Sequence, residues 1–86
     1  MDKEIAKFTK NATEEVIVRI VEYKGKDLVD IRAYVKPLIS DEGLKATRKG
    51  ICVRLEQLPE LINALKAAEK ESKKIKDARS GEINPN

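Results

Sequence analysis

The stretch that decides the fold is VIVRIVEYKGKDLVDIRAYV, residues 16–35. Side chains alternate with a period of two on both sides of a short break, residues 23–27, which contains Gly25. This pattern is typical of a β-hairpin. Because glycine readily takes a positive φ at the first central position of a type II′ turn, we predict a two-residue turn at Gly25–Lys26.

Such a turn gives the hairpin two chemically different faces. On the first face Ile20 pairs with Ile31 and Val18 with Ala33, so we expect this nearly apolar face to be the core. The second face carries two arginines and both tyrosines of the chain: Arg19, Tyr23, Arg32 and Tyr34. Cations can hold phosphates and rings can stack on bases, as a single-stranded nucleic acid requires. A polar face is also ordinary in an antiparallel sheet, so the pattern alone leaves a merely solvated face open.

Turn signals after the hairpin predict two more short strands. Pro37 ends the second strand because proline cannot donate to a ladder, and residues 40–43 (SDEG) are typical of a turn. A second turn is expected at residues 48–50. The four predicted strands of this antiparallel meander are residues 15–23, 27–35, 44–47 and 51–55.

From Glu56 onward the apolar period becomes helical, and we predict a helix over about residues 56–75. Pro59 falls in its first turn, where a missing N–H has no intrahelical partner. The fold class is therefore α+β, a four-stranded antiparallel sheet followed by one C-terminal helix. We expect residues 1–13 to be a flexible arm, residues 14–76 the domain and residues 77–86 a frayed tail.

The length and composition favour a homodimer that binds an anionic partner. A domain of 86 residues buries a small core, and the apolar helix face would gain from a second copy. The residues expected at this interface are Leu58, Leu61, Ile62, Leu65 and Ala68. Lysine and arginine exceed the acids by only 18 to 15, but four cations and no acid lie between Gly43 and Leu55.

The same composition argues against catalysis, metals and membranes. The chain has no histidine and a single cysteine, so we expect no zinc site, no cofactor and no internal disulfide. Cys52, between Ile51 and Val53, is expected to be a small buried hydrophobe. No catalytic constellation is present, so we expect a non-enzyme. Without a long apolar run or signal peptide, we expect a soluble protein that is not secreted and is located in the cytoplasm or nucleoid, or in the nucleus of a eukaryote.

Three blocks of the sequence resemble one known family. Residues 23–34 (YKGKDLVDIRAY), 44–51 (LKATRKGI) and 56–58 (EQL) are similar in order and spacing to the positive cofactor four family of transcriptional coactivators. The resemblance covers about residues 16–66. The chain departs from the family pattern at three positions: Val35 replaces a second stacking aromatic, Ala33 a glutamate and Leu58 a tryptophan.

The resemblance implies a homodimer, with one curved four-stranded sheet and one helix per subunit, that binds single-stranded DNA across the sheets. We expect binding of unwound DNA without strong sequence preference, with partners in the transcription machinery or a role in handling exposed single strands. The candidate nucleic-acid-binding residues are Arg19, Tyr23, Lys24, Lys26, Arg32, Tyr34, Lys45, Arg48 and Lys49. Two alternatives stay open: an RNA-binding variant, and a protein-interaction module whose basic sheet face is only solvated.

Overall fold

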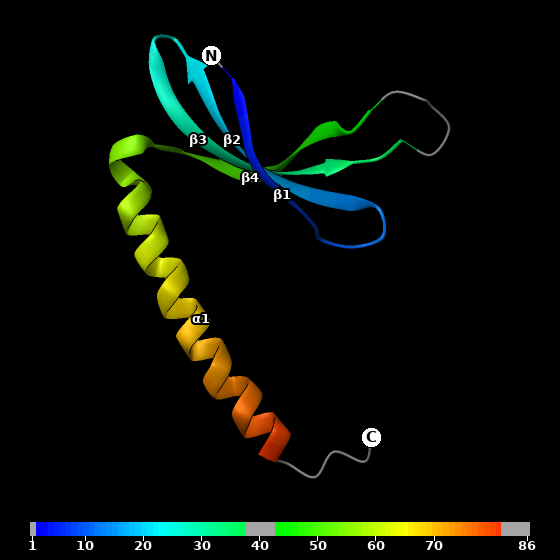
Figure 1. The fold of residues 1–86 in the computed structure, drawn as a ribbon, viewed down its shortest axis with the longest axis vertical. Helices are drawn as coiled ribbons and strands as arrows, with labels where there is room; N and C mark the ends of the chain where they lie inside the picture. Colours follow the sequence, from blue (N-terminus) through cyan, green and yellow to red (C-terminus); the bar gives the residue numbers. More distant parts are fainter. Residues whose placement is uncertain (1, 38–42, 82–86) are drawn as a thin grey trace. The chain divides into compact units, whose positions relative to one another are not determined.

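The computed structural model describes residues 2–37 and 43–81, which form four strands and one helix (Figure 1). The antiparallel strands follow one another in sheet order β1-β2-β3-β4, so the predicted meander and α+β class are confirmed. The elements are β1 (Lys3–Thr9), β2 (Glu14–Tyr23), β3 (Lys26–Val35), β4 (Lys45–Arg54), a 3-10 turn η1 (Leu55–Gln57) and α1 (Leu58–Gly81).

The strands divide the chain differently from the prediction. The expected flexible arm is wrong, because β1 pairs with β2 from Lys3 opposite Ile20 to Thr9 opposite Glu15. Its side chains are all exposed and of mixed character, which suits an edge strand but hides the alternation that signals a strand. The two strands predicted at residues 44–47 and 51–55 are one strand, β4, whose pairing with β3 is irregular between Ala46 and Gly50. The turn predicted at 40–43 lies largely outside the described residues.

The hairpin turn is one residue earlier than predicted. Lys24 and Gly25 both have positive φ, 51° and 77°, which makes the turn type I′ and not type II′. The register changes with it, and Arg19 pairs with Asp30 and not with Arg32. A shift of two residues keeps every side chain on its predicted face.

Pairing assigns side chains to two faces of the sheet, since residues directly opposite one another share a face. The apolar face carries Ala6, Phe8, Val16, Val18, Ile20, Val29, Ile31, Ala33, Val35, Ile51 and Val53. The polar face carries Arg19, Tyr23, Lys26, Asp30, Arg32, Tyr34 and Cys52.

The core of this sheet is thin and does not lie on one face. Val29 and Ala33 are buried on the apolar face, but Ile17 and Tyr34 are buried on the polar face, which corrects the one-sided core predicted above. Ile17 lies directly between Lys7 and Arg32 in the pairing, and the apolar stems of such side chains can cover it. On the apolar face, Phe8 remains 57% exposed and Ile51 48% exposed. The sheet therefore leaves apolar surface open to a partner.

The residues up to Glu56 and those from Gln57 onward form two compact units. In the second unit, α1 runs to Gly81, beyond the predicted end at residue 75, so the predicted tail is helical up to that point. Residues 82–86 of the predicted tail lie outside the described part. Pro59 lies in the first helical turn as predicted. No helix of the described residues has the length and apolar character needed to cross a membrane.

Candidate nucleic-acid interface

The tip of the β2–β3 hairpin presents the most exposed aromatic ring on the polar face. Tyr23 is 62% exposed, as expected for a ring outside the core. The ammonium of Lys24 lies 5.3 Å from the ring centroid, within cation–π distance, so the opposite face of the ring can receive a base. Lys24 holds a left-handed backbone conformation that costs a non-glycine residue about 1–2 kcal/mol. Tyr23, Lys24 and Lys26 thus form a compact cationic tip.

In the middle of the polar face, Arg19 and Tyr34 contact each other. Arg19 Nη1 donates to the Tyr34 hydroxyl at 2.9 Å, and Arg19 Nη2 forms an ion pair with Asp2 at 3.1 Å. The hydrogen bond to Tyr34 raises the pKa of Arg19. Tyr34 is only 9% exposed, so its ring is a packed part of the sheet and only its hydroxyl takes part in the polar face.

Beside this pair, Asp30 holds Arg32 and Cys52. Arg32 donates through Nη2 at 2.8 Å and through Nε at 3.1 Å to Asp30 Oδ1, and the Cys52 thiol lies 3.1 Å from the same oxygen. Burial opposes ionisation of Asp30, but these hydrogen bonds outweigh it and lower the pKa of the carboxyl. Asp30 in turn raises the pKa values of Arg32 and Cys52. Cys52 is exposed, so the expectation of a buried cysteine is wrong.

The irregular segment of β4 is held by side chains and glycine geometry. The Thr47 hydroxyl donates to the Ala33 carbonyl at 2.8 Å and accepts from the Lys49 amide at 3.1 Å. Arg32 Nη1 donates to the Thr47 carbonyl at 3.0 Å. A Cβ on Gly50 would overlap the Ile31 carbonyl oxygen and lie 2.8 Å from the Arg32 Cα, so only glycine allows this approach. The basic segment of β4, residues 47–50, is therefore held in a fixed conformation within the sheet.

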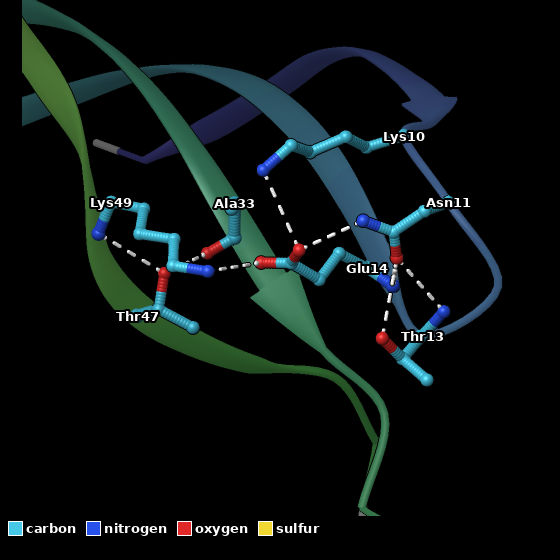
Figure 2. Close-up of polar contacts among 7 residues, drawn as sticks. All are labelled: Lys10, Asn11, Thr13, Glu14, Ala33, Thr47 and Lys49. Carbon is cyan, nitrogen blue, oxygen red and sulfur yellow. Dashed lines mark hydrogen bonds and ion pairs between the residues drawn. The ribbon is translucent and has the colours of Figure 1, made fainter.

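A third cluster surrounds Glu14 at the start of β2 (Figure 2). Its Oε1 accepts from Asn11 at 2.9 Å and from Lys10 at 3.4 Å, and its Oε2 from Lys49 at 3.3 Å. The hydrogen bonds from Asn11 and Lys49 lower the pKa of Glu14. Glu14 pairs with Val35 in the sheet, so this cluster lies on the apolar face.

The structure brings some of the predicted binding residues together and separates others. Five lie on the polar face or its tip: Arg19, Tyr23, Lys26, Arg32 and Tyr34, with Lys24 beside them in the turn. Lys45 pairs with Val35, and Lys49 bonds to Glu14, so these two lie on the apolar face. Arg48 is exposed and has no ion pair to any described residue.

Sequence reasoning missed the contacts of two acids, Asp30 on the polar face and Glu14 on the apolar face. Asp30 and Arg32 are two residues apart on a strand and so share a face, a signal that could have paired them. Glu14 and Lys49 are 35 residues apart, and no local pattern links them. Within the described ranges, no group of three or more histidine, cysteine or acidic side chains could hold a metal.

Comparison with known proteins places residues 10–64 in the family model described as Transcriptional Coactivator p15 (PC4). Two crystal forms of BPSL1147, a PC4 homolog from Burkholderia pseudomallei K96243, share this fold. The tetragonal form has 33% identity and a TM-score of 0.71, and it covers 80% of this chain and 98% of that one. The orthorhombic form has 35% identity and a TM-score of 0.72, over 80% and 90% of the two chains.

A more distant structure is similar in fold. It is the bacteriophage T5 homolog of the eukaryotic transcription coactivator PC4, implicated in recombination-dependent DNA replication. It shares 20% identity, with a TM-score of 0.66 over 92% of this chain and 89% of that one. The comparison with curated proteins found no match.

Proposed function

The chain belongs to the PC4 family of transcriptional coactivators, and we propose that it binds single-stranded DNA as a homodimer. A PC4-like role in DNA binding and coactivation follows from the family. The strand preference, the dimer and the absence of catalysis are our proposals. We propose that the bound strand is melted or otherwise exposed DNA, read without strong sequence preference.

The observation that carries the single-strand preference is the exposed tip of the β2–β3 hairpin. Tyr23 presents a ring to solvent with the Lys24 ammonium 5.3 Å from the ring centroid, and it pairs with Lys26 across the hairpin; the two lysines supply positive charge for phosphates. Bases can stack on a ring only when they are unpaired, and each such contact contributes about 1–3 kcal/mol. A duplex satisfies the cations but hides its base faces, so it loses the stacking share of the binding energy.

The open apolar surfaces support the dimer. The sheet of the first unit leaves Phe8 and Ile51 about half exposed, and α1 leaves Leu65 57% exposed. Exposed large apolar side chains favour association, and a second copy of the chain is a partner that is always available. We propose that the interface includes the helix residues predicted from the sequence: Leu58, Leu61, Ile62, Leu65 and Ala68.

The test is a titration of the protein with labelled single-stranded and duplex oligonucleotides at two salt concentrations, with light scattering on the free protein. We expect tighter binding to the single strand, a steep fall in affinity with salt and a dimer in solution. A protein-interaction module that docks through its apolar surface would bind its partner with an affinity nearly independent of salt. In this titration it would show no preference for the single strand over the duplex. An RNA oligonucleotide of the same sequence distinguishes an RNA-binding variant.

A further inference from the structure

Glu14 is a heavily hydrogen-bonded carboxylate on the apolar face. Its side chain is 10% exposed and accepts from an amide and two ammonium groups. Its main chain also closes the β1–β2 turn, because its carbonyl accepts from the amides of Lys10 and Asn11 and its amide donates to Asn11 Oδ1. A turn that connects β1 and β2 is thus tied through one carboxylate to a residue of β4.

The contact from Glu14 to Lys49 crosses the intervening strand β3 at Ala33, which lies between the two side chains in Figure 2. Ala33 has no side chain beyond Cβ to block this path. It lines a shallow pocket of about 220 Å³ together with Lys10 and Lys49.

The Lys49 end of this bridge belongs to the irregular segment of β4. The amide of Lys49 is bonded to the Thr47 hydroxyl, and the Thr47 carbonyl is held by Arg32 from the polar face. Arg48 lies between these two anchored residues, and its own side chain is exposed. The segment is therefore held on one face by Arg32 and on the other by Glu14.

We propose that Glu14 is a positioning residue for nucleic-acid binding: through Lys49 it holds the segment that presents Arg48 to a phosphate of the bound strand. The inference rests on the proposed function. It assigns different roles to two cations that are adjacent in the sequence. Arg48 contacts the phosphate, whereas Lys49 holds the β4 segment in place through Glu14.

If the Glu14 carboxylate is removed, simple electrostatic repulsion and the positioning role predict opposite changes in the affinity for DNA. If the carboxylate does nothing but repel phosphates, Glu14→Gln raises the affinity for DNA, and the freed Lys49 adds a phosphate contact that steepens the salt dependence. If Glu14 positions the segment, the same variant leaves Lys10 and Lys49 without a counter-charge and loosens the segment. The affinity then falls several-fold although a negative charge has been removed.

The experiment measures the affinity of the full chain for labelled oligo-deoxythymidine across a salt series. Arg48→Met should flatten the plot of log affinity against log salt by about 0.7, the value for one single-strand phosphate contact. Glu14→Gln and Lys49→Met should each lower the affinity and leave the slope unchanged. Circular dichroism is used to check that each variant folds. If Glu14→Gln does not fold, Lys49→Met tests the same contact, because it changes an exposed side chain.

A rescue variant tests the role of the crossing point. Glu14→Gln combined with Ala33→Glu places a carboxylate in the pocket that Lys10 and Lys49 line, and we expect it to recover affinity lost by Glu14→Gln. A Glu14→Gln affinity equal to or above that of the unchanged chain, or a Lys49→Met slope flattened like that of Arg48→Met, overturns the inference while the proposed function stands. Failure of the unchanged chain to bind the oligonucleotide overturns the proposed function itself.

Discussion

Two basic, glycine-containing segments of this sheet are alike in sequence and different in structure. The hairpin tip reads YKGK (residues 23–26) and the irregular part of β4 reads TRKG (residues 47–50). At the tip, the side chains project from a tight turn, and the contact of Lys24 with the Tyr23 ring is solvent-exposed. In β4, Thr47 and Gly50 are fixed against β3, and Lys49 is fixed by Glu14 of β2. Basic residues in similar motifs can therefore project freely from a turn in one place and be fixed within the sheet in another.

The largest loss of stability is expected from a side chain added at Gly50, where β4 approaches β3 closely. We expect Gly50→Ala to lower the free energy of unfolding by about 3 kcal/mol, because the new Cβ meets backbone of β3 that cannot move aside. Urea denaturation at fixed protein concentration measures this loss. The matched control is Gly43→Ala, which adds a Cβ in open space and should change stability little. Equal effects of the two variants would show that the close approach carries no constraint.

A conservative change at Arg32 tests, from the polar face, the contacts that hold the irregular segment of β4. Lysine keeps the positive charge, but it cannot donate to both Asp30 and the Thr47 carbonyl as the guanidinium does. We expect Arg32→Lys to lower the free energy of unfolding by about 2 kcal/mol. Arg48→Lys, at an exposed side chain, should be nearly neutral. If both variants kept full stability, the Arg32 contacts would have no structural role.

Removal of the charges at the tip should change binding and leave stability intact. Lys24→Met combined with Lys26→Met should flatten the log affinity–log salt plot for a single strand by about 1.4, twice the value for one phosphate contact. The affinity at low salt should fall about tenfold or more. The thermal midpoint checks that the fold is unchanged. An unchanged slope would move the path of the strand away from the hairpin tip.

The smallest effect is expected from acid titration of Asp30. Because the folded state lowers its pKa below the ordinary 3.8, its ionised form stabilises the fold above that value. This stabilisation is lost as the pH falls through the lower, folded-state pKa. The stability difference between the unchanged chain and Asp30→Asn should thus be largest near neutral pH and shrink below about pH 3.8. Urea midpoints at neutral and acidic pH measure it, and a difference independent of pH would contradict the Asp30–Arg32 pairing.

The fold class and the family could be predicted because their signals are local. The alternation around Gly25 predicts the hairpin and its two faces, and the period change near Glu56 predicts the helix. The predicted register was wrong by two residues because the sequence does not indicate that Lys24 adopts a left-handed conformation. Strand β1 was missed because an exposed edge strand has no apolar period.

The positions of the predicted interface residues in the fold could be foreseen only in part. Tyr23 is exposed as expected, since strand parity determines its face. The burial of Tyr34 and the contact of Lys49 with Glu14 depend on the pairing of distant strands. Position in a basic motif therefore identifies a cation, and only the fold shows which group its charge faces.

The measurement that tests the central claim most directly is the ratio of single-strand to duplex affinity for the unchanged chain and for Tyr23→Ala. With a single exposed ring on the tip, we expect a preference of about tenfold for the single strand, near the lower end of one stacking contact. Tyr23→Ala should remove most of this preference, with Tyr34→Phe as a control that keeps the tip and should retain it. A ratio that Tyr23→Ala leaves unchanged would contradict the account, and the protein would then be a general polyanion binder.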